Sequence, residues 1–211
     1  MLNIVILASG NGSNFQAIAD RANEIGVRIK ALIVNKKEAF VLERARKANV
    51  PAILIEHKNF PDRESFCQAL DKAISQQGTV DYIILAGFMR VLSPSFVNKY
   101  AYRIINLHPS LLPKYKGLNT HARALADKAA YHGMTIHFVS EVLDDGPIIF
   151  QEKIKIEPQD DLASLKAKVQ AQEHKYYPLV IKWLAQRRTQ LQGNQVYFDD
   201  KCLPAEGIAC D

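Results

Sequence analysis

An asparagine and a histidine two residues apart, Asn106 and His108, follow an apolar run of the sequence. Alternate residues of a β-strand point to the same face, so we expect both side chains to point together beyond the end of a strand. The asparagine amide donates hydrogen bonds, and a protonated histidine donates one and also exchanges protons. Together they could stabilise the oxyanion that forms when an acyl group is transferred to an amine or to water. Pro109 and Pro113 favour a shaped loop after this strand.

Two adjacent aspartates, Asp144 and Asp145, stand in an Asp-Asp-Gly-Pro segment further along the chain. A carboxylate close to an imidazole favours the charged form of the ring and raises its pKa. An aspartate that reaches His108 would therefore keep this histidine protonated at neutral pH. The segment is also typical of an ordinary turn, and its pattern leaves open which aspartate faces inward.

A glycine-rich turn, SGNGSNF at 9–15, lies between the first predicted strand and the following helix. At this position of an α/β sheet, backbone N–H groups and the helix N-terminus bind anions. Phe15 stands where a dinucleotide-binding turn has its third glycine, and the lysine of a P-loop is missing. We expect a phosphate monoester site formed by the backbone of Gly12, Ser13 and Asn14, with the Ser13 hydroxyl as a further donor. A simple capped turn is the alternative.

The order of elements predicts an α/β fold, with a mostly parallel, Rossmann-like sheet and helices on both faces. The predicted strands of the parallel series lie at 2–8, 28–34, 52–55 and 82–85. The predicted helices lie at 14–23, 39–48, 62–77 and 161–190. Alternating residues at 134–139 and 148–156 predict an added antiparallel strand pair. The 211 residues suffice for one large domain, which we prefer to two lobes.

Composition narrows the class of protein. The sequence has no apolar run of about 20 residues and no basic leader before its first strand, so we expect a cytoplasmic protein without a membrane span. The net charge is +5, but the basic residues are scattered. This pattern favours an anionic small molecule over nucleic acid as the partner. The histidines and the cysteines (Cys67, Cys202 and Cys210) lack metal-ligand spacing, so we expect no metal site and no disulfide framework.

Five segments, in this order along the chain, carry a resemblance to a known family. They are SGNGSN at 9–14, LAGFMRVL at 85–92, NLHPSLLPKY at 106–115, LDDGP at 143–147 and QEHKYYP at 172–178. With them the sequence resembles the phosphoribosylglycinamide formyltransferases, folate-dependent enzymes of purine synthesis, over nearly its whole length. HPSLLP alone is shared with methionyl-tRNA formyltransferase and formyltetrahydrofolate deformylase. The glycine-rich turn near the N-terminus narrows the resemblance to the first family.

The resemblance implies the formyltransferase fold and transfer of a formyl group in de novo purine biosynthesis. The group would pass from 10-formyltetrahydrofolate, a co-substrate, to the amine of 5-phosphoribosylglycinamide, giving the N-formyl ribonucleotide and tetrahydrofolate without a metal. The alternatives are a formyltetrahydrofolate hydrolase and a non-catalytic phosphoribosyl-binding module. The expected partners are these two small molecules, and the protein would be a monomer or a homodimer. The single domain would have a phosphate-binding half at 1–100, a catalytic and folate-binding half at 101–190, and a tail at 191–211.

The resemblance also implies roles for individual residues. The catalytic residues would be Asn106, His108 and Asp144. The ribonucleotide would contact Gly12, Ser13, Asn14, Gln170, Ala171, Gln172 and Glu173. The folate would contact Arg63, Met89, Arg90, Val91, Leu92, Asn106, Ser140, Glu141, Val142, Leu143 and Asp144. The sequence departs from the family pattern at Asp145, often glycine in relatives, and at Asn119, often histidine.

Overall fold

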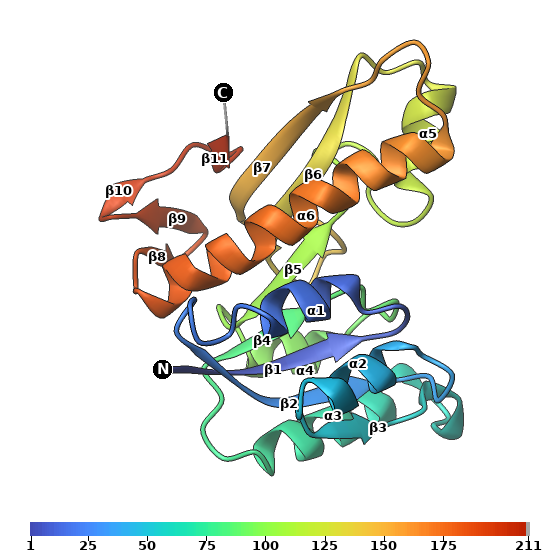
Figure 1. Cartoon of the computed structure of the whole chain (residues 1–211). Coiled ribbons are helices and arrows are strands. Elements are labelled where there is room, and N and C mark those ends of the chain that lie inside the picture. Colours follow the sequence, from blue (N-terminus) through green and yellow to red (C-terminus); the bar gives the residue numbers. More distant parts are fainter. Residues whose placement is uncertain (210–211) are drawn as a thin grey trace. The chain divides into compact units, whose positions relative to one another are not determined.

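The computed structural model describes residues 1–209, which form two compact units (Figure 1). The first unit is Met1–Asn106 and the second begins at Leu107. The boundary falls inside one strand, β5 (Ile104–His108), so the chain passes from one unit to the other within the segment that carries Asn106 and His108. Cys210, for which no disulfide or metal role was expected, lies outside the described residues.

The first unit contains five parallel strands. They are β1 (Leu2–Ala8), β2 (Val27–Val34), β3 (Ala52–Leu54), β4 (Tyr82–Leu85) and β5, in the spatial order β3-β2-β1-β4-β5. The central strand β1 is fully buried from Ile4 to Ala8, as expected for a continuous apolar run covered on both faces. Because all five strands run the same way, the loops after their carboxyl ends gather at one edge of the sheet, where ligands bind in α/β proteins.

The helices of the first unit follow these strands. They are α1 (Ser13–Ala19), α2 (Val41–Lys47), the short 3₁₀ helix η1 (His57–Asn59), α3 (Arg63–Ser75) and α4 (Pro94–Lys99). A side-chain cap sets the start of α3, where the Asp62 carboxylate accepts the Ser65 N–H at 2.8 Å. Helix α1 ends at Ala19, four residues earlier than predicted, because a turn follows that leads into β2. Helices η1 and α4 were not predicted, since one short turn of helix leaves little periodicity to detect.

The second unit contains α5 (Thr120–Ala126), β6 (Tyr131–Phe138), β7 (Ile148–Lys155) and α6 (Leu162–Ala185). Strands β6 and β7 are antiparallel, with Tyr131 opposite Lys155 and His137 opposite Ile148. The short β11 (Ile208–Ala209) lies parallel to β7. The predicted fold class, a mostly parallel Rossmann-like sheet with an added antiparallel strand pair, is confirmed.

The region after α6 differs from the prediction. The helix was expected to run to Gln190, but it ends at Ala185 because Arg187 adopts a left-handed conformation with φ of 59°. The chain then forms a hairpin of β8 (Thr189–Gln192) and β9 (Gln195–Phe198) about Gly193, and β10 (Lys201–Cys202) extends it. Over residues 1–209, none of the helices combines the length and the apolar character needed to cross a bilayer.

Candidate active site

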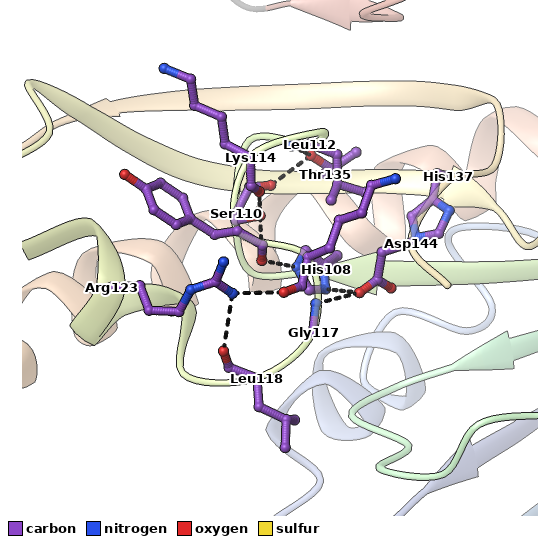
Figure 2. Close-up of polar contacts among 12 residues, drawn as sticks. His108, Ser110, Leu112, Lys114, Gly117, Leu118, Arg123, Thr135, His137 and Asp144 are labelled. Atoms are coloured by element: carbon purple, nitrogen blue, oxygen red, sulfur yellow. Dashed lines mark hydrogen bonds and ion pairs between the residues drawn. The ribbon is translucent and has the colours of Figure 1, made fainter. Parts of the chain in front are cut away.

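His108 and Asp144 form an ion pair in the second unit (Figure 2). The Nδ1 atom of His108 lies 3.4 Å from Oδ2 of Asp144, and both side chains are less than a tenth exposed. The same carboxylate oxygen accepts the backbone N–H of Gly117 at 2.8 Å. Asp144 adopts a left-handed conformation with φ of 49°, which aspartate tolerates better than most residues. The inward-facing carboxylate that the sequence left open is therefore Asp144.

The second ring nitrogen of His108 also faces an oxygen acceptor. Its Nε2 atom lies 2.9 Å from the backbone carbonyl of Tyr115. With a carbonyl at Nε2 and a carboxylate at Nδ1, the contacts are complete for an imidazolium ring, which carries an N–H on each nitrogen. Both ring nitrogens of His108 therefore face oxygen acceptors. The roles of Tyr115 and Gly117 could not be read from the sequence, since both act through backbone atoms.

The loop after His108 is held by a network of buried hydrogen bonds. Thr135 donates its hydroxyl to the Ser110 carbonyl at 2.6 Å and accepts the Leu112 N–H at 3.1 Å. Gln151, opposite Thr135 in the β6–β7 register, donates to the Leu112 carbonyl at 2.8 Å and to the Thr135 hydroxyl at 2.9 Å. The peptide bond between Leu112 and Pro113 is cis. These contacts fix the path of the chain directly after the catalytic candidate.

Asp145 points to a different partner from Asp144. Its carboxylate pairs with the Lys116 ammonium, and the side chain is about half exposed. The neighbouring segment is held by Arg123, which donates to the Lys116 carbonyl at 2.7 Å and lies over the Tyr115 ring, 5.4 Å from its centroid. The extra charge at Asp145 is thus balanced locally by a lysine.

Other histidines lie close to this pair. His137 is fully buried, and burial lowers its pKa to about 4, although the Phe138 carbonyl and the Asp144 charge act in the opposite direction. Its Nδ1 donates to the Phe138 carbonyl at 2.9 Å. His132 stands 3.0 Å from His121, between Nε2 and Nδ1, and burial lowers its pKa to about 4 as well. Both buried rings are neutral at pH 7, so the candidate site has neutral imidazoles around the His108–Asp144 pair.

Asn106 lies two residues before His108 in β5, opposite Leu85 of β4, and is half-buried. Strand alternation places the backbone positions 106 and 108 on the same face. The predicted ribonucleotide contacts at 170–173 lie within α6, where Glu173 is buried and Ala171 is exposed. Their roles stay predictions.

The glycine-rich turn has the position that the sequence predicted. Gly12 adopts φ of 77°, and Ser13 and Asn14 are the first residues of α1. A side chain at Gly12 would run into Val41 of α2, so close packing as well as conformation requires glycine here. Residues 9–14 line a cavity of about 280 Å³, which Lys36 also lines. Lys36 had not been singled out in the sequence.

The predicted folate contacts are divided between the two units. In the first, Arg63 and Met89–Val91 line a cavity of about 520 Å³, together with Lys58 and Phe66. Leu92, the next residue in the sequence, is buried. In the second unit, the predicted residues Ser140, Val142 and Asp144 line a cavity of about 630 Å³. Residues of the C-terminal hairpin region also line this cavity. Glu141 and Leu143 are exposed in the same loop.

Among residues 1–209, no three histidine, cysteine, aspartate or glutamate side chains are grouped so that they could hold a metal ion. Cys67 is buried and accepts the Ser93 N–H at 3.3 Å, whereas Cys202 is exposed, and both are free thiols. The arrangement at His108 offers proton exchange and oxyanion stabilisation by protein groups.

Comparison with known proteins defines the class first. Residues 2–181 match the sequence profile of the family described as Formyl transferase. The fold agrees: the phosphoribosylglycinamide formyltransferase structure from Coxiella burnetii, solved with CHES, superposes with a TM-score of 0.94 at 46% identity, covering 99% of this chain and 98% of that one. The predicted formyltransferase fold is confirmed.

Full-length relatives narrow the class. The phosphoribosylglycinamide formyltransferase of Escherichia coli K12 is 45% identical over 212 residues, covering 100% of both chains. The enzyme of the same name from Haemophilus influenzae is 42% identical, covering 99% of both. The structure of glycinamide ribonucleotide transformylase 1 from Symbiobacterium toebii has a TM-score of 0.90 at 36% identity, covering 94% of each chain. The chain belongs to the formyl transferase family and, within it, to the phosphoribosylglycinamide formyltransferases.

Proposed function

We propose that this protein transfers the formyl group of 10-formyltetrahydrofolate to the amine of 5-phosphoribosylglycinamide. The products are the N-formyl ribonucleotide and tetrahydrofolate, and the step belongs to de novo purine biosynthesis in the cytoplasm. The observation that carries the proposal is the His108 ring, which has a carboxylate at one nitrogen and a carbonyl at the other. Full-length relatives of the same name support the choice of substrates.

In the proposed mechanism the glycinamide amine attacks the formyl carbon directly. Asn106 and protonated His108 stabilise the tetrahedral oxyanion, and Asp144 keeps the charge on His108. The bond between the formyl carbon and the folate nitrogen then breaks, and the leaving nitrogen gains one proton while the attacking amine loses one, so that the step balances. Since Asp144 holds Nδ1, the donor available to the oxyanion is the Nε2–H, which here is donated to the Tyr115 carbonyl. The segment that contains Tyr115 must therefore give way when the formyl oxygen binds.

The binding roles follow the sequence prediction. We assign the substrate phosphate to the backbone of Gly12–Asn14 and a second ribonucleotide contact to residues 170–173. The folate is assigned to Arg63, to residues 89–92 and to the loop 140–144. The protein acts as a monomer or a homodimer and as a single functional domain in this proposal.

One assay tests the function. Loss of 10-formyltetrahydrofolate is followed spectrophotometrically with and without glycinamide ribonucleotide, and the formylated ribonucleotide is measured in parallel. We expect turnover that requires the ribonucleotide, with one formyl product for each folate consumed. Equal loss of formyl-folate without the ribonucleotide would indicate a hydrolase. Ribonucleotide binding without any turnover would indicate a binding module.

A further inference from the structure

The cavity at the glycine-rich turn has an uneven distribution of charge. Its lining consists of residues 9–14, Ala86, Gly87, Met89 and Lys36. Within the described part of the chain, Lys36 is the one charged side chain of this lining, and no carboxylate contributes to it. A cavity of about 280 Å³ that is lined by a glycine-rich turn and by one lysine, with no carboxylate, is suited to an anion.

The fold explains how Lys36 reaches the turn. It follows buried Asn35, directly beyond the end of β2, and β2 lies parallel to β1, with Val34 opposite Ala8. Parallel neighbours place the residues after both strands at the same edge of the sheet, which brings Lys36 beside the loop that leaves β1. The Lys36 side chain is exposed and forms no hydrogen bond or ion pair with the described residues, whereas its backbone carbonyl accepts the Ala39 N–H at 3.2 Å. The next residue, Lys37, instead lies 4.0 Å from a carboxylate oxygen of Glu38 and does not line the cavity.

A second cation holds the turn in place from α2. The Arg44 guanidinium donates from Nε to the Asn11 carbonyl at 2.8 Å and from Nη2 to Asn11 Oδ1 at 2.9 Å. It also lies over the Phe40 ring, 5.1 Å from the centroid. The start of α2 adds a further link, since the Val41 N–H donates to the Gly10 carbonyl at 3.1 Å. A planar group with two directed donors fixes Asn11 in a way that a flexible ammonium cannot.

We propose that Lys36 is a ligand of the phosphate monoester of the ribonucleotide and that Arg44 is a positioning residue for the turn that binds it. This inference rests on the proposed function and extends its phosphate site. Near neutral pH a phosphate monoester carries a charge of about −1.5 to −2, and the backbone donors of the turn are uncharged. Lys36 supplies the compact positive charge that the turn lacks, and Arg44 keeps the turn in the shape that presents its donors.

The test measures binding of ribose 5-phosphate by calorimetry, with Lys37→Ala as the matched control for Lys36→Ala. We expect Lys36→Ala to weaken binding tenfold or more and to reduce its dependence on salt, while Lys37→Ala stays within twofold of the wild type. Folate affinity and the melting temperature should be the same in all three proteins. Wild-type affinity for ribose 5-phosphate in Lys36→Ala, or no binding by the wild type, would overturn the assignment of Lys36.

Arg44→Lys tests the positioning role against Arg46→Lys, a substitution on the same helix at a residue that pairs with Glu43. We expect Arg44→Lys to raise the KM for the ribonucleotide several-fold with kcat and the KM for folate unchanged, and Arg46→Lys to change none of them. Equal effects of both would overturn the role of Arg44. Failure of the proposed function is distinguishable, because it appears as wild-type protein that binds ribose 5-phosphate but transfers no formyl group.

Discussion

Replacing Asp144 by asparagine removes one negative charge and leaves the shape of the loop almost unchanged. The backbone there has φ of 49°, which asparagine adopts as readily as aspartate. The Asp144 carboxylate accepts the Gly117 N–H at 2.8 Å, and the asparagine oxygen can accept the same hydrogen bond. The variant therefore isolates the effect of the charge on His108.

The distance between the two groups gives the scale of the effect. At 3.4 Å and an effective dielectric constant of about 20, the attraction between an imidazolium and the Asp144 carboxylate is about 5 kcal/mol. Desolvation of the buried pair offsets part of it. If about half of this attraction stabilises the transition state, turnover of Asp144→Asn should fall on the order of a hundredfold, which corresponds to about 2.7 kcal/mol. The affinities for both substrates should change much less.

Asp145→Asn is the matched control. Asp145 pairs with Lys116, and their side chains are 51% and 35% exposed, so this contact contributes about 0–1 kcal/mol. We expect turnover within about threefold of the wild type, which corresponds to less than about 1 kcal/mol. NMR of the His108 ring at pH 7 should show less imidazolium in Asp144→Asn and no change in Asp145→Asn. A larger loss of turnover in the control, or an unchanged His108 ring in Asp144→Asn, would refute the assignment of the carboxylate.

Three other predictions follow from the contacts. Gly10→Val and Gly12→Val should both weaken ribonucleotide binding, measured by calorimetry. Gly10→Val should leave the melting temperature unchanged, because a Cβ at this position meets nothing within 4 Å, whereas Gly12→Val should lower it, because the side chain runs into α2. The segment 113–117 should be cut by trypsin in the free protein and protected when both substrates are bound, because a loop that closes over the substrates becomes inaccessible to the protease; equal cutting rates would contradict the closure. The contribution of His132 and His137 to stability should be constant above about pH 7 and fall as the pH drops from about 6.5 to 4, because the unfolded chain protonates both rings and the folded chain, with pKa values of about 4, does not. Each of the two histidines should lower the free energy of unfolding by about 3 kcal/mol at pH 4 relative to pH 7, and urea unfolding at pH 7, 5 and 4 measures this loss.

The parts of the fold that the sequence predicted correctly have strong periodicity. The apolar run at 2–8 is the central strand, and the alternating segments at 134–139 and 148–156 are antiparallel partners. The end of α6 was missed because helix propensity continues through the residues after Ala185. Pairing of β8 with β9 overrides this local preference, and such pairing is a tertiary effect that a single segment does not show.

Some residues of the candidate site could likewise be predicted from the sequence, and others could not. His108 was predictable because its chemistry lies in its side chain, and the structure adds that Asp144 is the aspartate beside it. The acceptor at Nε2 and the donor to Asp144 are backbone groups of Tyr115 and Gly117, and every residue has such groups. Lys36 was missed for another reason, since its position depends on the pairing of two strands.

The contacts of His108 and Asp144 also tie two loops together. The Tyr115 carbonyl accepts from His108, and the Gly117 N–H donates to Asp144, so one segment contacts both members of the ion pair. A movement that frees Nε2 of His108 for the formyl oxygen therefore also disturbs the hydrogen bond that Asp144 receives from Gly117. A carboxylate that loses a neutral donor directs more of its charge toward the remaining partner, which is His108. In the proposed mechanism, release of the ring by the 113–117 segment would therefore let the Asp144 carboxylate act more strongly on His108 as the oxyanion forms.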